Sequence, residues 1–278
     1  MGKFDNVVIA TDLDGTFLGK GATLVQRNLD AVKYFTENGG HFTIATGRFP
    51  KHAAMAFPSV AEYVNIPAAT CNGAYIYDFV SESTGDVMTI PYELMRELME
   101  FVYANFSNAG LRISAEGHSF ICTPGDLKCS YVANEFGKLG ADEKLIIPME
   151  ELQEYVLYKA VIRDDPDNID DVIAKVRENF GGRLYITQSG KTIIDIQIFG
   201  ADKGKGIRKI VDKYLGEGMT LYTCGDYLND IDFHAAADVA VCPSNARDEI
   251  KAISDLCLCS NDEGLIADLV EYIEQKIK

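Results

Sequence analysis

The sequence predicts an α/β protein built on a doubly wound parallel sheet, with a separate α+β segment inserted into it. Short apolar runs alternate with amphipathic helical patterns at both ends of the chain, and this alternation is typical of a parallel sheet. The middle of the chain instead combines helices with pairs of short strands. We therefore expect a core formed by residues 1–82 and 200–278, interrupted by an α+β domain at residues 83–199.

The first predicted strand ends in two aspartates. The run from Val7 to Thr11 is short and has no polar alternation, which is typical of a strand buried on both faces. Asp12 and Asp14 are two residues apart, so their side chains point to the same side of an extended chain. Ligands of open parallel sheets bind beyond the carboxyl ends of the strands. Two anions crowded there need a compensating cation or proton, so the pair predicts a charged site.

Helices and strands alternate in the rest of the first core segment. Thr23 and Gln26 form a capping-box pattern, which predicts the start of a helix. The strands that follow are expected at residues 41–45, 69–71 and 75–77. A second helix separates the first two of these strands, and Asn72-Gly73 forms the turn before the third.

The insertion is predicted to open with a turn at residues 83–86. Its helices are expected at residues 92–106, 126–137 and 167–180. Its strands are expected at residues 111–115, 120–123, 157–163, 184–187 and 193–199. His118 lies between two of these strands and is interpreted as a hairpin-turn residue, with contact to a substrate as the alternative.

The alternating pattern resumes at Lys205, and we place Lys203 in the loop that returns from the insertion. Strands are expected at residues 220–224, 238–241 and 256–259. Helices are expected at residues 206–215, 245–253 and 265–277, with a further one opened by Asn229-Asp230.

Composition excludes several classes of protein. A net charge of −16 argues against nucleic acid as a partner, because its phosphates require a basic surface. No apolar run approaches the ~18 residues of a membrane-spanning helix. The 7 cysteines are scattered without a C-x-x-C pair, which predicts reduced thiols in a cytoplasmic protein. Nothing in the sequence distinguishes a monomer from a homo-oligomer.

Candidate functional residues follow several of the predicted strands. They are Asp12 and Asp14, Thr46-Gly47-Arg48, Lys203, and the run Gly225-Asp226-x-x-Asn229-Asp230. In this order they resemble the haloacid dehalogenase superfamily, most of all its Cof-type phosphatases, whose cap domain (type IIB) lies between the second and third motifs. The runs Asn72-Gly73-Ala74 and Asp262-Glu263-Gly264 occur in the family's order too. The resemblance covers essentially the whole chain and implies a Rossmann-like core with an α+β cap.

The resemblance implies that Asp12 is a nucleophile and that Asp14 is the general acid and base. Physical reasoning agrees, because a carboxylate nucleophile divides phosphate-ester hydrolysis into two steps through an aspartyl-phosphate. A second carboxyl group can protonate the leaving oxygen and later activate water.

Mg²⁺ is the cofactor that the resemblance implies. Asp226 would hold it together with Asp12 and the backbone carbonyl of Asp14, because magnesium prefers oxygen ligands. Asp230 either ligates the metal or orients the residues that do. The alternative is a purely structural role, as a negative charge that the helix dipole favours at a helix N-terminus. Lys203 is preferred over Lys205 as the catalytic lysine, because it precedes Gly204 and lies nearer the strand end.

The other positions are expected to contact substrate. Thr46 would bond a phosphoryl oxygen through its hydroxyl, and the Gly47 amide would add a donor. Arg48 faces either substrate or solvent, and Asn229 contacts substrate or Asp12 or caps a helix.

Together these residues predict a Mg²⁺-dependent phosphatase of small phosphorylated metabolites, with sugar phosphates favoured. A phosphomutase or phosphotransferase of the same superfamily is the nearer alternative. A metal-dependent sensor that binds a phosphorylated ligand without turnover is the more distant one.

Overall fold

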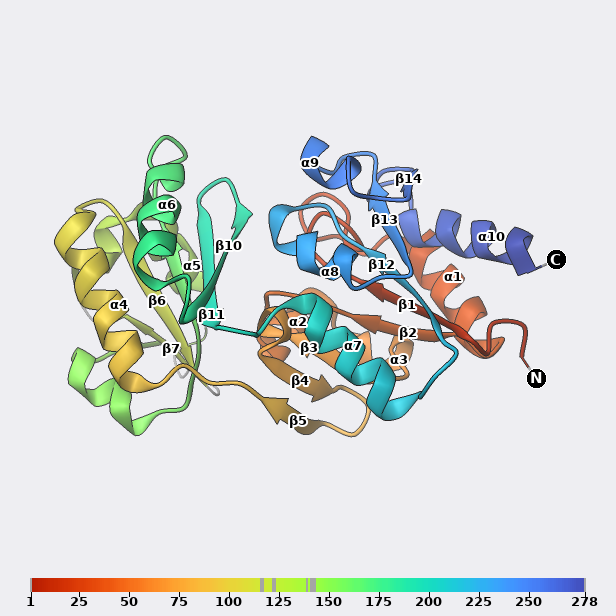
Figure 1. Cartoon of the computed structure of the whole chain (residues 1–278), viewed down its shortest axis with the longest axis horizontal. Coiled ribbons are helices and arrows are strands. Elements are labelled where there is room, and N and C mark those ends of the chain that lie inside the picture. The colour runs from red at the N-terminus through yellow and green to blue at the C-terminus, as the bar shows by residue number, and fades with distance from the viewer. Residues whose placement is uncertain (1, 116–117, 122–123, 139, 141–143, 278) are drawn as a thin grey trace. The chain divides into compact units, whose positions relative to one another are not determined.

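The computed structural model describes residues 2–115, 118–121, 124–138, 140 and 144–277, and its contacts divide the chain into two units. The first unit contains Met1–Val87 and Asp202–Lys278, and the second contains Met88–Ala201 (Figure 1). The assignment of the insertion as a cap domain stays a prediction, and each unit is described by itself below.

Five parallel strands form the main sheet of the first unit. Their order is β14 (Leu256–Leu258), β13 (Val239–Pro243), β12 (Thr220–Cys224), β1 (Val7–Thr11) and β2 (His41–Ile44). All four neighbouring pairs are parallel. The chain leaves β1 toward β2 on one side and returns to β12 on the other, so a topological switch point lies beside β1. The predicted fold class, a doubly wound parallel sheet, is confirmed.

Helices cover both faces of this sheet. Those that share hydrophobic clusters with its strands include α1 (Gln26–Glu37), α7 (Lys203–Tyr214), α8 (Ile231–Ala235) and α10 (Leu265–Ile277). Alternate residues of β1 divide between two hydrophobic clusters. Ile9 lies in the cluster that contains the apolar faces of α1 and α10. Val8 and Ala10 lie in the cluster that contains α7 and Phe233 of α8. Burial on both faces explains the continuous apolar run of β1.

The start of α1 differs from the sequence-based prediction. The helix begins at Gln26 with Val25 as its N-cap residue, and no side chain caps it. The hydroxyl of Thr23 instead donates to the backbone oxygen of Lys20 at 3.2 Å. The predicted capping box is therefore wrong, because Thr23 is used in the preceding turn.

A second, three-stranded sheet continues the first unit. It contains the antiparallel strands β3 (Ala68–Thr70), β4 (Tyr75–Asp78) and β5 (Ser83–Val87). The prediction of a turn at residues 83–86 is wrong, since Thr84 pairs with Tyr77 inside β5. This strand is exposed along most of its length, so its polar composition reflects an edge position. This unit also contains the helices α2 (Pro50–Ala56), α3 (Val60–Tyr63) and α9 (Asp248–Lys251).

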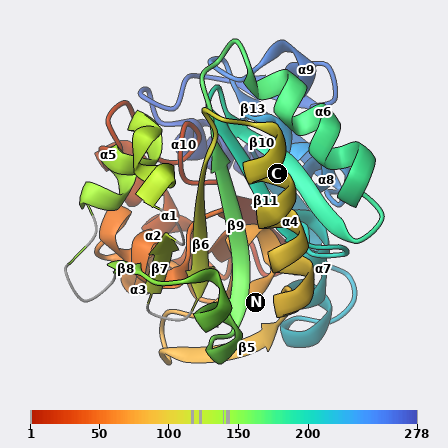
Figure 2. The same ribbon diagram turned by 90° about the vertical axis from the view of Figure 1, so that its left-hand side faces the viewer.

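The second unit is an α+β arrangement around one sheet. The strand order is β10 (Leu184–Gly190), β11 (Ile193–Ile198), β9 (Leu157–Arg163), β6 (Gly110–Ala115), β7 (His118–Ile121) and β8 (Lys144–Ile146). Neighbours are antiparallel except β7 and β8. Figure 2 shows β6 and β9 side by side. Helices α4 (Tyr92–Asn105) and α6 (Ile169–Phe180) share one hydrophobic cluster with the sheet, and α5 spans Ser130–Lys138.

Several predictions in the second unit change. The helix predicted at residues 126–137 is a 3₁₀ helix at Pro124–Lys128 followed by α5. His118 is the first residue of β7 and pairs with Ala115, so its interpretation as a turn residue is wrong. The strand predicted at residues 120–123 ends at Ile121 in the structure, and its last two positions lie outside the described residues. No helix in the described part of the chain has the length and apolar character needed to cross a membrane.

Asp238 should stabilise the junction between α8 and β13 in a pH-dependent way. Its carboxylate accepts from Leu221 N at 2.8 Å and from Arg208 Nη2 at 2.9 Å. Burial would raise the pKa of Asp238, but these two donors lower it below its ordinary value. Such a group stabilises the fold above its unfolded-state pKa and ceases to do so as the pH falls through its folded-state pKa. We expect Asp238→Asn to lower the Tm by about 1–3 °C at pH 7.

Thermal denaturation of both proteins from pH 7 to pH 3 checks this expectation. The difference in Tm should shrink as the pH falls. A difference that stays constant over that range would show that the charge of Asp238 does not contribute.

Candidate active site

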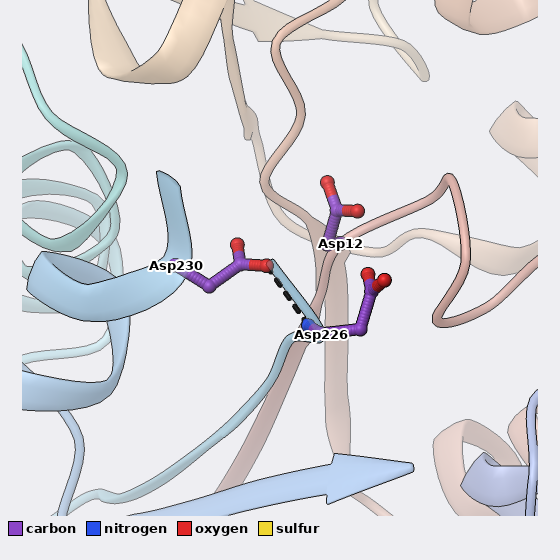
Figure 3. Close-up of side chains that lie close together, drawn as sticks. All are labelled: Asp12, Asp226 and Asp230. Atoms are coloured by element: carbon purple, nitrogen blue, oxygen red, sulfur yellow. Dashed lines mark hydrogen bonds between the residues drawn. The ribbon is translucent and has the colours of Figure 1, made fainter. Parts of the chain in front are cut away.

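The carboxyl ends of β1 and β12 bring two distant aspartates together. Thr11 pairs with Cys224, and the backbone N–H of Asp12 donates to Cys224 O at 2.8 Å. Asp226 follows β12 by two residues, and Asp230 ends the short 3₁₀ helix η5 (Leu228–Asp230). One carboxylate oxygen from each of Asp12, Asp226 and Asp230 can be chosen so that the three lie within 4.8 Å of one another (Figure 3). The sequence motifs therefore converge on one acidic cluster.

Glycines permit this close approach. Gly15 has a φ of +85°, and a Cβ built there would lie 2.5 Å from Asp226 Oδ2. A Cβ on Gly225 would lie 2.5 Å from Asp230 Cγ. Both positions lie against the carboxylates of the cluster, so a side chain at either would displace them.

Lys203 supplies the positive charge of the cluster. Its Nζ lies 2.7 Å from Asp12 Oδ1 and 2.7 Å from Asp230 Oδ1, and its side chain is fully buried. Lys203 is the first residue of α7 and not a loop residue as predicted, because Asp202 caps the helix one position earlier. Lys205 pairs with Asp202 instead, and its side chain is 68% exposed. The structure thus brings Lys203, and not Lys205, to the carboxylates.

The cluster holds more negative charge than the lysine compensates. Burial raises the pKa of Asp12 well above its ordinary value, with Lys203 opposing and the neighbouring aspartates adding to the rise. Burial and the charge of Asp230 raise the pKa of Asp226 to about 7. Burial alone would lower the pKa of Lys203, but Asp12 and Asp230 raise it above its ordinary value. A divalent cation would relieve this excess, and carboxylate oxygens are its preferred ligands.

The three carboxylates differ in how their oxygens are used. Asp230 is fully buried, and its Oδ2 accepts from the backbone N–H groups of Asp226 at 2.9 Å and Tyr227 at 3.1 Å. Its Oδ1 accepts from Lys203. Asp226 accepts from the Thr16 hydroxyl at 2.8 Å through Oδ1. Asp230 therefore orients both Lys203 and the loop that carries Asp226.

Asp14 lies apart from this group in its contacts. Both of its oxygens accept from Arg48, through Nε at 2.7 Å and Nη2 at 2.7 Å. The Asp14 side chain is 52% exposed. The hydrogen bond to Asp14 outweighs burial and raises the pKa of Arg48. Arg48 thus faces Asp14. The Asp14 carboxylate is half-exposed and follows the same strand, β1, as the buried Asp12.

The remaining predicted residues lie in the loop after β2 and in η5 of the same unit. Thr46 is buried, its backbone N–H donates to Ala69 O, and its hydroxyl oxygen accepts from Arg48 N at 3.2 Å. Asn229 is also buried, and its Nδ2 donates to Asn72 Oδ1 at 3.4 Å. Gly47 lies between Thr46 and Arg48 in the same loop.

Sequence reasoning assigned no role to three polar residues that contact the site. Thr16 bonds Asp226, and Asn72 bonds Asn229. Asn245 donates to Gly15 O at 2.8 Å and thereby holds the loop after β1. The only feature of the sequence that could have indicated a role for Thr16 is its place in the run that begins at Asp12.

Known proteins match this chain over nearly its whole length. A sequence model of the haloacid dehalogenase-like hydrolase family matches residues 9–270. The 5-amino-6-(5-phospho-D-ribitylamino)uracil phosphatase YwtE of Bacillus subtilis is 26% identical over 95% of this chain and 97% of its own length. The pyridoxal phosphate phosphatase YbhA of Escherichia coli is 26% identical over 95% and 97%. The crystal structure of SMU.1108c from Streptococcus mutans has a TM-score of 0.80 at 22% identity, covering 96% and 98%, and so shares the fold.

Removing the charge of Lys203 should strongly destabilise the protein in the absence of divalent cations. Lys203→Met leaves Asp12 and Asp230 buried without their shared cation, and breaking a buried ion pair in this way costs about 3–5 kcal/mol. Lys205→Met is the matched control, because that ammonium is exposed and should contribute less than about 1 kcal/mol. Urea denaturation with a chelator present measures both, and equal losses would contradict the expectation.

Proposed function

Since the chain belongs to the haloacid dehalogenase-like hydrolases and is a phosphatase, we propose that it hydrolyses small phosphorylated metabolites with Mg²⁺, sugar phosphates among them. The observation that carries this proposal is the cluster of Asp12, Asp226 and Asp230 around one buried lysine. The relatives named above act on a phosphorylated ribitylaminouracil and on pyridoxal phosphate. Both substrates are small phosphate monoesters, which supports the substrate class.

The excess of carboxylates suits a divalent cation. Asp12 and Asp226 are the residues that would hold Mg²⁺, with the backbone carbonyl of Asp14 as a further ligand. Asp230 has both oxygens engaged by Lys203 and backbone N–H groups, so it fits an orienting role better than direct ligation. Bound Mg²⁺ would neutralise charge on the phosphoryl oxygens and fix the direction of attack.

Asp12 is the nucleophile in this proposal. Its Oδ1 accepts from Lys203, which orients the carboxylate. An Asp12 oxygen forms a bond to phosphorus while the bond from phosphorus to the leaving oxygen breaks, and an aspartyl-phosphate results. Water then attacks the phosphorus, the bond to Asp12 breaks, and phosphate leaves. Lys203 stays charged throughout, because the Asp230 carboxylate still holds it while Asp12 carries the phosphoryl group.

Asp14 transfers the protons. In its acid form it protonates the leaving oxygen, and its carboxylate then accepts a proton from the attacking water. Its exposure allows exchange with solvent, and Arg48 orients it through two hydrogen bonds. The Thr46 hydroxyl and the Gly47 amide would donate to phosphoryl oxygens, and Asn229 would contact the substrate.

Two further predictions belong to this proposal. The insertion, predicted at residues 83–199, would select the leaving group. The cytoplasm is the proposed compartment, where thiols stay reduced. The six cysteines that the structure describes carry free thiols.

Phosphate release should depend on Asp12 and on Mg²⁺. We expect turnover of a panel of sugar phosphates, measured as inorganic phosphate, to cease when a chelator removes the metal. Asp12→Asn should lower kcat by at least about a thousandfold, as loss of a nucleophile does in other hydrolases. Equal phosphate release by Asp12→Asn would refute the proposal. An isomerised sugar phosphate without free phosphate would instead indicate a phosphomutase, and tight binding without turnover a sensor.

Asp226 should be required for binding Mg²⁺. A cation at one hundred times its Kd stabilises the folded state by about 2.7 kcal/mol, which corresponds to a rise in Tm of roughly 5–10 °C. We expect this rise in the natural protein and its loss in Asp226→Asn. Asp238→Asn is the control, because Asp238 contacts Leu221 and Arg208 and not the cluster. An unchanged Mg²⁺ response in Asp226→Asn would exclude this residue as a ligand.

A further inference from the structure

The turn after β3 has an unusual backbone. Cys71, Asn72 and Gly73 form the 3₁₀ segment η1 and have φ angles of +50°, +52° and +87°. Residues with a Cβ rarely adopt positive φ, and two in succession persist only when the surrounding structure holds them. Both non-glycine residues are buried. The turn is therefore held in a strained conformation by its contacts.

Those contacts join the turn to the loop that carries Thr46. The backbone N–H of Cys71 donates to Arg48 O at 2.9 Å, and the backbone N–H of Asn72 donates to Thr46 O at 2.9 Å. Two consecutive backbone N–H groups thus hold the carbonyl groups of the residues before and after Gly47. The position of Thr46 is fixed by the same turn that carries Asn72.

The turn also packs directly on the beginning of α7. A Cβ built on Gly73 would lie 2.1 Å from Asp202 O, and a Cβ on Gly206 would lie 2.9 Å from Gly73 Cα. Backbone therefore touches backbone at the helix turn that begins with Lys203. Only glycine fits at position 73, both for its φ and for this approach.

The Asn72 side chain reaches a third segment. Its Oδ1 accepts from Asn229 Nδ2 at 3.4 Å, and Asn229 directly precedes Asp230. Asparagine suits this position for two reasons. It tolerates left-handed φ better than other residues with a Cβ. Aspartate would offer the same acceptor but would add negative charge beside a loop that already carries excess carboxylate.

We infer that Asn72 is a positioning residue: its side chain acts through Asn229, its backbone N–H holds Thr46, and both are thereby set relative to Lys203. This inference rests on the proposed function, since it assigns Asn72 to the alignment of the phosphoryl-binding groups. Asn72 itself need not touch substrate. Small displacements of aligned groups are costly in catalysis, so loss of the Asn72 amide should lower kcat more than it changes KM.

Substitutions at position 72 separate the backbone from the side chain. Both Asn72→Gly and Asn72→Ala remove the side-chain amide and keep the backbone N–H. Glycine adopts the left-handed φ without strain, whereas alanine disfavours it. We expect both variants to lose at least about tenfold in kcat with an aryl phosphate and Mg²⁺. Only Asn72→Ala should also lose Tm. Wild-type kcat in Asn72→Gly would overturn the inference.

Asn65→Ala is the matched control in the same unit. The Asn65 side chain bonds Phe42 N at 2.9 Å and Gly40 O at 2.9 Å, at the opposite end of β2 from Thr46. We expect this variant to lose Tm and to keep kcat. A loss of kcat as large as that of Asn72→Gly would show that position 72 acts only through general stability.

A double variant tests whether Asn72 acts through Asn229. If it does, Asn72→Gly combined with Asn229→Ala should turn over no more slowly than Asn229→Ala alone. Losses that multiply would overturn the coupling. Calorimetric binding of inorganic phosphate with Mg²⁺ gives a readout without turnover, and Asn72→Gly should bind at least about threefold more weakly than the natural protein and Asn65→Ala.

The inference and the proposed function fail in different ways. Phosphate release that Asp12→Asn abolishes, together with unchanged kcat and phosphate affinity in Asn72→Gly, would retain the function and reject the role of Asn72. A natural protein without turnover would reject the function. Weakened phosphate binding in Asn72→Gly would even then support the positioning role, and unchanged binding would reject it.

Discussion

The ammonium of Lys203, held between Asp12 and Asp230, is the contact on which the rest of the site depends. It joins the end of β1 to the start of α7 and to η5, and it spans 191 positions of sequence between Lys203 and Asp12. A buried charge is tolerated only when it is paired and hydrogen-bonded. Each of the three residues is therefore stable in its place only because the other two are present.

The parallel sheet makes that contact possible. Strands β1 and β12 run in the same direction with Thr11 beside Cys224, so the residues that follow both strands emerge at one edge. Alternate residues of β1 pack into clusters on opposite faces, which fixes the strand from both sides. A rigid scaffold is what a catalytic arrangement requires, because small displacements of its groups are costly.

The elements that could be predicted from the sequence are those with long or strongly periodic apolar patterns. Strands β9 and β12 and helix α10 have the predicted bounds, because each buries a continuous or periodic apolar set. Strand β5 could not be recognised, since an exposed edge strand carries polar residues that resemble a turn. The capping of α1 was also predicted wrongly, because the Thr23 hydroxyl bonds Lys20 in the preceding turn and does not cap the helix.

For the site, residue type and strand order predicted which groups would meet. Asp12 and Asp226 follow neighbouring strands, so their proximity is a consequence of the fold class. The contacts of Thr16 and Asn72 were not predictable, because they depend on how loops fold back over the strand ends. Both residues stand in runs that resemble family motifs, but those runs do not say which groups the two side chains contact.

The division of the core by the insertion has a consequence for how the protein is made. Val7 of β1 pairs with Thr220 of β12, so the centre of the sheet must wait until the ribosome has added about 210 further residues. At about 5–20 residues per second this delay is roughly 10–40 s. The second unit, Met88–Ala201, is one uninterrupted stretch and can assemble its own sheet in the meantime. During synthesis β1 can pair with β2, but its other edge, which pairs with β12 in the folded protein, stays unpaired until the second core segment has been made. Such an unpaired edge on an apolar strand favours aggregation, so we expect this edge to need protection during synthesis.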